Sequence, residues 1–187
     1  MKTMISMLLT LTIIGAFAGG GLAKVSAWAD PLIAANKKAE TERAIFLVNP
    51  AGKSYEAVPD LKFTIYNVYD EAKQSIGYSL PWEGNGFQGK IGIMIGLSTD
   101  LSTISSIEIL EQVETPGLGT KITEDPFRKQ FSGMKAEPQV DWVKGAPPTK
   151  PNEIQTITGA TISSKAIVAI VNDGLSTARA AMGGKTK

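Results

Sequence analysis

The pattern of apolar and polar positions divides the chain into three parts. Met4–Ala23 contains no charged residue and lies between Lys2 and Lys24. Pro31–Phe46 then shows the apolar spacing of a helix. Beyond Pro50, short β-branched runs alternate with polar positions and turn residues, which is typical of strands. We therefore expect an apolar anchor, a connecting helix and a folded domain over residues 1–24, 25–48 and 49–187.

The domain is predicted to contain both strands and helices. The strand-like runs are Leu61–Tyr66, Gln74–Leu80, Ile91–Leu97, Ile104–Leu110 and Val140–Val143. A short helix is expected at Asp125–Phe131, where Pro126 suits the first turn. The apolar positions of the last helix are Ile162, Ala166, Ile167, Ile170, Val171, Leu175, Ala178 and Met182. One continuous apolar face predicts packing on a sheet, and hence an α+β fold with an antiparallel sheet.

Two interpretations fit the apolar run at the N-terminal end. Its twenty residues, at about 1.5 Å each, span the roughly 30 Å hydrocarbon core of a bilayer. Ala27-Trp28-Ala29 instead has the small-x-small pattern of a signal peptidase site, although the run is longer than a usual signal core. Trp28 also suits a membrane interface. We expect an uncleaved, single-pass anchor, and both interpretations place the domain outside the cytoplasm.

The composition excludes several kinds of function. There are 19 Lys and Arg against 18 Asp and Glu, so the net charge of +1 gives no sign of nucleic-acid binding. The chain has no Cys and no His. It therefore has no disulfide, no cysteine-ligated iron–sulfur cluster and no histidine base, and metal catalysis is not expected. Any redox chemistry requires an organic group bound to the protein.

The segment Thr158-Gly159-Ala160-Thr161 leads into the last helix and places Thr161 in its first turn. Backbone N–H groups there lack intrahelical partners, and together with the helix dipole they favour an anion such as phosphate. The simpler interpretation is helix capping, with Thr158 as the cap and Gly159 easing the entry.

Glycine also shapes a second loop, Glu114-Thr115-Pro116-Gly117-Leu118-Gly119. A turn alone accounts for the Pro and Gly residues. A backbone that approaches a flat ligand closely, with Leu118 against its face, also explains why an aliphatic side chain lies between two glycines. The Gly84–Gly89 loop carries Phe87, and Lys144 at a strand end is either a solvated lysine or a donor to a carbonyl group or an anionic ring.

Together, the two segments resemble the FMN-binding domain of the G subunit of Rnf electron-transport complexes and the C subunit of the Na⁺-translocating NADH:quinone reductase. The matching residues are Glu114 to Gly119 and Thr158-Gly159-Ala160-Thr161-Ile162-Ser163-Ser164. The helix that contains Asp30-Pro31-Leu32 is similar to the same subunits. This resemblance implies a single transmembrane helix followed by an FMN-binding domain with an antiparallel sheet packed against helices.

The resemblance also implies a covalent cofactor. In that family a flavin transferase joins FMN through its phosphate to the last threonine of the [Ser/Thr]-Gly-Ala-Thr motif. Thr161 is the implied acceptor, and Thr158, Gly159 and Ala160 complete the turn. Contacts with the isoalloxazine ring are implied for Glu114, Thr115, Leu118, Gly119 and Lys144.

By the same resemblance, the chain is expected to be an electron-relay subunit of a translocase in the cell (inner) membrane, with its flavin domain on the extracytoplasmic side. The whole complex would couple electron transfer from ferredoxin to NAD⁺ with Na⁺ or H⁺ translocation, and neither the NAD nor the ferredoxin site would lie in this chain. The implied partners are other membrane subunits, the lipid bilayer and, during maturation, the flavin transferase.

Other interpretations stay open from the sequence. The chain is alternatively the C subunit of a quinone reductase, a flavin-free membrane-anchored assembly module, or a soluble flavin domain released after Ala29. Two positions depart from the family pattern: Gln155 replaces a frequent acidic residue, and Ala146 replaces the second glycine of Lys-Gly-Gly. If the acid assists the transferase, flavin attachment is expected to be less efficient in this chain.

Overall fold

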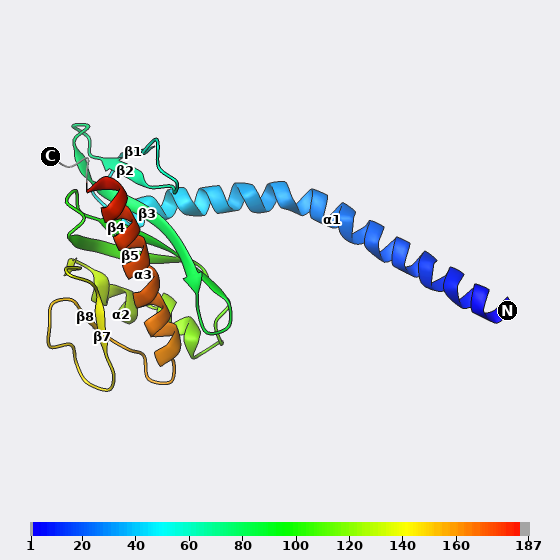
Figure 1. Ribbon diagram of the computed structural model, residues 1–187. Helices are drawn as coiled ribbons and strands as arrows, with labels where there is room; N and C mark the ends of the chain where they lie inside the picture. The colour runs from blue at the N-terminus through cyan, green and yellow to red at the C-terminus, as the bar shows by residue number, and fades with distance from the viewer. Residues whose placement is uncertain (1, 184–187) are drawn as a thin grey trace. The chain divides into compact units, whose positions relative to one another are not determined.

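The computed structural model describes residues 2–183 (Figure 1). Residue 1 and residues 184–187, the outer ends of the predicted anchor and domain, lie outside the described part. The chain forms two compact units, Met1–Glu40 and Thr41–Lys187. Its helices are α1 (Lys2–Val48), α2 (Asp125–Arg128) and α3 (Thr161–Met182), with 3₁₀ helices η1 (Gly119–Thr123) and η2 (Lys129–Phe131). Its strands are β1 (Ser54–Ala57), β2 (Tyr66–Tyr69), β3 (Ser75–Asn85), β4 (Lys90–Leu97), β5 (Thr103–Glu111), β6 (Met134–Lys135), β7 (Asp141–Val143) and β8 (Glu153–Gln155).

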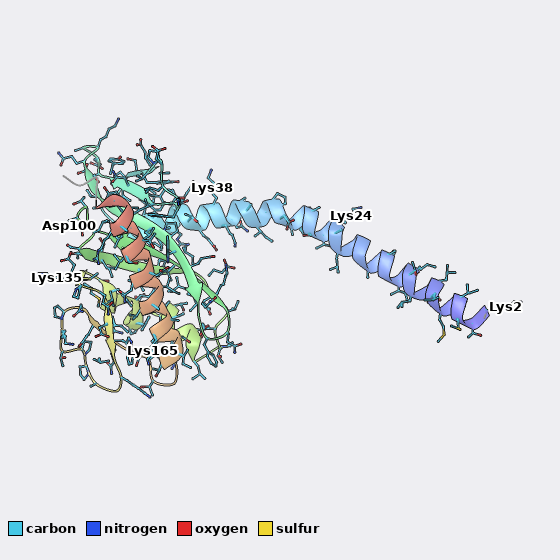
Figure 2. All side chains as sticks on the ribbon, viewed as in Figure 1. Lys2, Lys24, Lys38, Asp100, Lys135 and Lys165 are labelled. Atoms are coloured by element: carbon cyan, nitrogen blue, oxygen red, sulfur yellow. The ribbon has the colours of Figure 1, made fainter. Side chains whose placement is uncertain are left out.

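Helix α1 is continuous across the boundary predicted between anchor and connecting helix. Pro31 lies inside it, although proline removes one backbone donor from a helix. Lys2 and Lys24 lie at the two ends of the uncharged stretch (Figure 2). The apolar part is wholly exposed and is able to cross a membrane by length and composition, a property that signal sequences share.

The main sheet of the second unit is antiparallel, as the sequence predicts. Strands β1 to β6 are neighbours in chain order, and every adjacent pair is antiparallel. The short strands β7 and β8 form a separate parallel pair. The sequence predicts β7 but not β1, β6 or β8, each of which has only two to four residues. So short a run carries too little alternation to be recognised.

The strand predicted at Leu61–Tyr66 is wrong. Strand β2 begins only at Tyr66, and the residues before it form bends and irregular backbone. Leu61 and Phe63 pack on the core from this loop, and Ile65 is fully buried. The alternation in this segment therefore reflects the burial of every second side chain and not strand pairing.

Strand β4 separates the two hydrophobic clusters of the domain because successive side chains of a strand face opposite sides. Ile91, Ile93, Ile95 and Leu97 belong to the large cluster, which also contains the buried face of α3. Met94 belongs to the small cluster, with Ala44, Ile45, Val48 and Val68. The last turns of α1 and helix α3 thus pack on opposite faces of the sheet, and α3 lies across one face in Figure 1.

Two glycines flank Met94 on the face toward α1, and they differ in the space around them. A Cβ added to Gly96 would lie 2.6 Å from the Val48 carbonyl oxygen and 2.9 Å from the Val48 Cβ. A Cβ added to Gly92 would lie 3.6 Å from its nearest neighbour, the Glu111 Cβ. We expect Gly96→Ala to lower the free energy of unfolding by about 2 kcal/mol through overpacking.

Gly92→Ala on the same strand is the matched control, and it is expected to leave that free energy within about 0.5 kcal/mol of wild type. Chemical denaturation of the full chain in detergent, followed by tryptophan fluorescence, measures both. Equal effects of the two substitutions would contradict the close contact between β4 and the end of α1.

Candidate functional site

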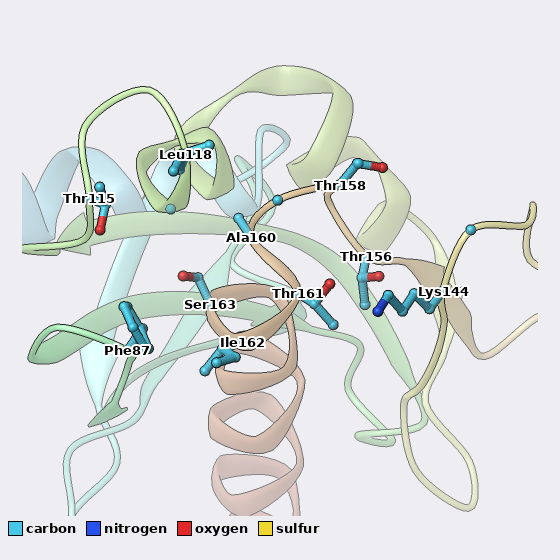
Figure 3. Close-up of a pocket in the computed structure, with 13 residues that line it drawn as sticks. Phe87, Thr115, Leu118, Lys144, Thr156, Thr158, Ala160, Thr161, Ile162 and Ser163 are labelled. Carbon is cyan, nitrogen blue, oxygen red and sulfur yellow. The ribbon is translucent and has the colours of Figure 1, made fainter.

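A cavity of about 570 Å³ lies where the Thr115–Gly119 loop, the start of α3 and the ends of β7 and β8 meet (Figure 3). It is lined by Phe87, Thr115, Leu118, Gly119, Lys144, Gly145, Thr156, Thr158, Gly159, Ala160, Thr161, Ile162 and Ser163. Eight of the nine residues that the family resemblance implies as cofactor contacts are in this lining. Glu114 is the exception. The tertiary structure therefore brings the two predicted loops and Lys144 to one cavity.

Helix α3 begins at Thr161, as the sequence predicts, but the capping interpretation is wrong. The N-cap residue is Ala160, and no side chain makes a capping hydrogen bond. Thr158 is instead exposed in the preceding turn. The first-turn amide groups are thus not used by a side-chain cap and remain available to an anion beside Thr161.

The turn before α3 is held by Ser164, which is fully buried. Its hydroxyl accepts a hydrogen bond from the Ile157 amide at 3.0 Å and donates one to the Ala160 carbonyl at 3.0 Å. The Ala160 amide donates to the Ile157 carbonyl, also at 3.0 Å. Gly159 has φ +85°, a conformation that L side chains rarely adopt. These contacts explain why a glycine precedes Ala160 and why a serine follows one turn later.

Leu118 joins the second loop to this turn. Its Cδ2 atom would lie 3.3 Å from a Cβ added to Gly159, and its side chain is 47% exposed. The Leu118 and Thr120 amides both donate to the Thr115 carbonyl at 3.2 Å, which closes the loop. Leu118 therefore presents an apolar surface over the glycine turn, and its contact with a flat ligand stays a prediction.

Glu114 is not among the residues that line the cavity, and it is only 3% exposed. Its Oε1 atom accepts hydrogen bonds from the Phe87 and Gln88 amides, each at 2.9 Å. Its Oε2 atom accepts a hydrogen bond from the Ser163 hydroxyl. The carboxylate thus connects the Gly84–Gly89 loop to the first turn of α3. Glu114 therefore supports the two segments that it connects. The resemblance implies a contact between Glu114 and the flavin ring, and these hydrogen bonds do not include such a contact.

The absence of a side chain at Gly119 leaves space for the Glu114 carboxylate. A Cβ added there would lie 2.8 Å from the Glu114 Cβ and 2.9 Å from both the Glu114 Oε2 and the Ser163 Oγ. The second glycine of the loop is therefore required by close packing. The first, Gly117, has φ +73° and open space around it, so its role is conformational.

Lys144 and Thr156 lie at neighbouring positions just beyond the parallel pair β7 and β8. Val143 is paired with Gln155, and the Thr156 amide donates to the Val143 carbonyl at 2.9 Å. Lys144 is exposed, whereas Thr156 is 4% exposed. Thr156 is not predicted from the sequence as a site residue because β8, which precedes it, is too short to be recognised from periodicity.

The prediction that Ile162 belongs to the buried apolar face of the last helix is wrong. The sequence places it on the apolar face of the last helix, yet it is 57% exposed and lines the cavity. The face that packs on the sheet begins one turn later, and it includes Ile167, Ile170, Val171, Leu175, Ala178 and Met182. Helical spacing continues beyond the packed part of α3, so periodicity alone does not separate a core position from a cavity position.

The comparisons with known proteins point to one kind of domain. Residues 86–176 match the family model of the FMN-binding domain, and these residues contain both loops and Lys144. This stretch of the chain is therefore similar to the FMN-binding domain. Groups of three or more His, Cys, Asp or Glu residues that could hold a metal ion are absent from the described residues.

Among its relatives, the G subunit of the Na⁺-translocating ferredoxin:NAD⁺ oxidoreductase complex of Acetobacterium woodii is 41% identical, over 47% of this chain and 42% of that protein. The G subunit of the proton-translocating complex of Clostridium ljungdahlii is 36% identical over 62% and 60%. The C subunit of the Na⁺-translocating NADH-quinone reductase of Vibrio vulnificus is 35% identical over 47% and 37%. The matches thus cover between 37% and 60% of the length of these relatives.

Two solved structures share the fold of this chain. NqrC of Shewanella oneidensis superposes with a TM-score of 0.59 and 17% identity, over 73% of this chain and 74% of that one. The C subunit of the Na⁺-translocating NADH-quinone reductase of Parabacteroides distasonis superposes with a TM-score of 0.61 and 20% identity, over 76% and 92%. The α+β architecture predicted from the sequence is therefore confirmed.

The cavity fits FMN in size and in chemistry. Its volume is within the range of roughly 300–1,000 Å³ that is usual for sites of small molecules and cofactors. Phe87, Leu118 and Ile162 are large exposed apolar side chains on its lining, suited to a flat aromatic ring. The uncapped start of α3 suits a phosphate. Lys144 adds a positive charge, which a reduced anionic flavin would attract.

Gln155 occupies the position at which the resembled family often has an acidic residue. Two hydrogen bonds with Gln130 hold the Gln155 backbone. The Gln155 amide donates to Gln130 Oε1 at 2.7 Å, and Gln130 Nε2 donates to the Gln155 carbonyl at 3.2 Å. The Gln155 side chain itself is exposed. Position 155 therefore presents an uncharged side chain to solvent.

Glu153 stabilises the loop that precedes β8 and the cavity. Its carboxylate accepts hydrogen bonds from the Thr149 amide at 2.9 Å and the Lys150 amide at 3.2 Å, and the Lys150 ammonium lies 2.9 Å away. These interactions, with the Thr149 amide first, lower the pKa of Glu153 from 4.5 to about 2. Because the folded-state pKa is the lower one, ionised Glu153 stabilises the fold above about pH 4.5, and this stabilisation disappears as the pH falls toward 2.

We therefore expect Glu153→Gln to lower the melting temperature of the full chain at pH 6 and to have little effect near pH 2.5. Thermal melts of the two proteins across this range measure the difference. Glu137→Gln, at an exposed glutamate outside this loop, is the control and should show no such convergence. A difference between wild type and Glu153→Gln that stayed constant with pH would contradict the role assigned to the Glu153 carboxylate.

Proposed function

We propose that this chain is a membrane-anchored flavoprotein subunit that relays electrons through FMN joined to Thr161 by its phosphate, within an Rnf-type complex. The observation that carries the proposal is the cavity in which Thr161, at the uncapped start of α3, lies with Leu118 and Lys144. The match to the FMN-binding domain and the G-subunit relatives support it.

Each part of the site has a defined task in this proposal. The Thr161 hydroxyl would lose its proton and form the ester bond to the flavin phosphate of a flavin dinucleotide supplied by the transferase, and the bond to the second phosphate would break so that a nucleoside monophosphate leaves. The amide groups of the first turn would bind the phosphate oxygens. Leu118 and Phe87 cover the flat ring, and Lys144 stabilises negative charge that develops on reduction. FMN itself supplies the capacity to accept and release one or two electrons.

Attachment through the phosphate leaves one negative charge beside the helix N-terminus, which such a position stabilises by roughly 0.3–1 kcal/mol. Thr158, Gly159 and Ala160 form the turn that presents Thr161 to the transferase. A covalent bond also prevents loss of the cofactor from a domain that lies outside the cytoplasm. The uncharged part of α1 anchors the subunit in the cell (inner) membrane with the flavin domain on the extracytoplasmic side.

The other membrane subunits of the complex are the proposed partners, and the flavin transferase acts during maturation. Ferredoxin oxidation, NAD⁺ reduction and the movement of Na⁺ or H⁺ belong to the whole complex. The similar proteins carry both ions in their names: a Na⁺-translocating complex in Acetobacterium woodii and a proton-translocating complex in Clostridium ljungdahlii. The proposal therefore includes translocation without assigning the ion.

Purification of the native complex from membranes tests this function. We expect the chain to keep flavin fluorescence after denaturing electrophoresis and to copurify with membrane proteins that reduce NAD⁺ with ferredoxin. A chain without flavin absorbance in the native membrane would instead be a flavin-free assembly module. A shorter chain that begins after Ala29 would contradict the uncleaved anchor.

A second function has specific support. The Vibrio vulnificus relative is a C subunit of the Na⁺-translocating NADH-quinone reductase, at 35% identity. Such a protein would use the same FMN site with a different electron donor and acceptor. Copurification with NADH:quinone reductase activity, in place of ferredoxin:NAD⁺ activity, would establish this alternative.

A further inference from the structure

Thr156 has a buried hydroxyl without a partner. Its side chain is 4% exposed, and its Oγ1 atom makes no hydrogen bond within the described part of the chain. A buried hydroxyl in this state is unfavourable, and native proteins rarely retain one without a reason. The other such atom among the described residues is Arg128 Nε, whose guanidinium is already paired with Glu108 and Asp125.

Thr156, the residue that carries this hydroxyl, lines the cavity, and the stick view shows it beside Lys144 (Figure 3). The hydrogen bond from the Thr156 amide to the Val143 carbonyl holds the backbone at this position. Thr156 and Lys144 are thus neighbours in the cavity lining where the parallel pair β7 and β8 ends.

The two ends of the cavity are lined by different kinds of side chain. Lys144, the charged residue of the lining, lies with Thr156 on one side of Thr161 in the close-up, and the aromatic Phe87 lies with Thr115 on the other (Figure 3). An isoalloxazine ring has the same asymmetry, with carbonyl oxygens and ring nitrogens along one edge and a dimethylbenzene ring at the other. The phosphate has its own donors at the start of α3, so the hydroxyl of Thr156 is not needed there.

We propose that Thr156 is a flavin-positioning residue whose hydroxyl makes a hydrogen bond to the polar edge of the isoalloxazine ring, next to Lys144. The inference rests on the proposed function, since it requires FMN in this cavity. It adds a contact that the sequence motif does not contain. A hydrogen bond to this edge holds the ring in one orientation and changes the stability of the reduced state relative to the oxidised one.

The test is a titration of the full chain, produced without flavin transferase and held in detergent, with FMN and with riboflavin, which lacks the phosphate. Thr156→Val removes the hydroxyl at nearly constant shape. It is expected to weaken binding of both ligands by the same factor, about five- to tenfold, which is the usual effect of one net hydrogen bond. Thr156→Ser keeps the hydroxyl and is expected to bind both ligands within about twofold of wild type.

Two further measurements separate positioning from a structural role. Without flavin, Thr156→Val is expected to melt at or above the temperature of wild type, because the hydroxyl has no protein partner to lose. In the flavin-loaded chain, the same variant is expected to shift the flavin absorption spectrum and midpoint potential, and Thr156→Ser is expected to restore both.

The possible results are distinguishable. Equal affinity of Thr156→Val and wild type for both ligands would overturn the inference alone. An effect on FMN but not on riboflavin would place the hydroxyl at the phosphate and overturn the ring contact. A lower melting temperature of Thr156→Val without flavin would show a structural partner and also overturn it. A wild-type chain that binds neither ligand would overturn the proposed function together with this inference.

Discussion

Thr161→Ala is expected to abolish covalent flavin in a chain coexpressed with a flavin transferase. The substitution removes the hydroxyl that accepts the phosphate, and the neighbouring positions 160 and 162 carry none. The Ser163 hydroxyl also belongs to the cavity lining, but it is buried and donates a hydrogen bond to Glu114. Intact mass measures the loss of one FMN per chain, and peptide mass spectrometry across Ile154–Lys165 locates the modified residue in wild type.

Thr158→Ala is the matched control. Thr158 lies in the same turn and lines the same cavity, but it is exposed and lies ahead of the helix. We expect this variant to keep the mass of one FMN because the Thr161 hydroxyl is retained. A Thr161→Ala chain that still carried the FMN mass, or a modified peptide with flavin on Ser163 or Ser164, would contradict the assignment.

Glu114→Ala is expected to give the largest loss of stability of any substitution near the site. The change removes an acceptor for two part-buried amide donors and one buried hydroxyl, which belong to Phe87, Gln88 and Ser163. Leaving such donors unpaired costs about 1–3 kcal/mol each, partly relieved by water, so we expect the free energy of unfolding to fall by about 3 kcal/mol. Denaturant unfolding of the flavin-free chain in detergent measures this.

Glu56→Ala, at an exposed glutamate on β1, is expected to change the same free energy by less than about 0.5 kcal/mol. Glu114→Gln keeps one oxygen acceptor and is expected to lie between Ala and wild type. The result also separates two roles for Glu114. A ring contact alone would lower flavin affinity and leave the stability of the flavin-free chain unchanged, whereas the supporting position lowers stability even without flavin.

The site could be predicted from the sequence where the chemistry is local. A helix that begins at Thr161, and a loop in which Pro and two glycines surround Leu118, follow from residue types within a few positions of each other. Lys144 could be placed in the site only by family resemblance, because its proximity depends on the pairing of β7 with β8. The same parallel pairing brings Thr156 to the site, and no pattern in the nearby sequence identifies Thr156 as a site residue.

Fold prediction succeeded where alternation is long enough to show a period. Strands β4 and β5 and helix α3 occur where the sequence predicts them, because each buries one clear face. Alternation at Leu61–Phe63 has the same appearance but belongs to a loop packed on the core. Backbone pairing distinguishes the two cases, and it depends on residues distant in the chain.

By itself the sequence determined the uncharged N-terminal run, the α+β class, the absence of Cys and His, and the glycine turn before Thr161. Each of these follows from composition or from spacing within one element. Only the tertiary structure decided that Glu114 is buried and supports the site through hydrogen bonds, and that Ile162 lines the cavity. It also decided that the Thr156 hydroxyl is buried without a hydrogen-bond partner among the described residues. The physical reason is that burial and hydrogen bonding depend on which distant segments of the chain come into contact. The periodicity of a short segment does not determine those contacts.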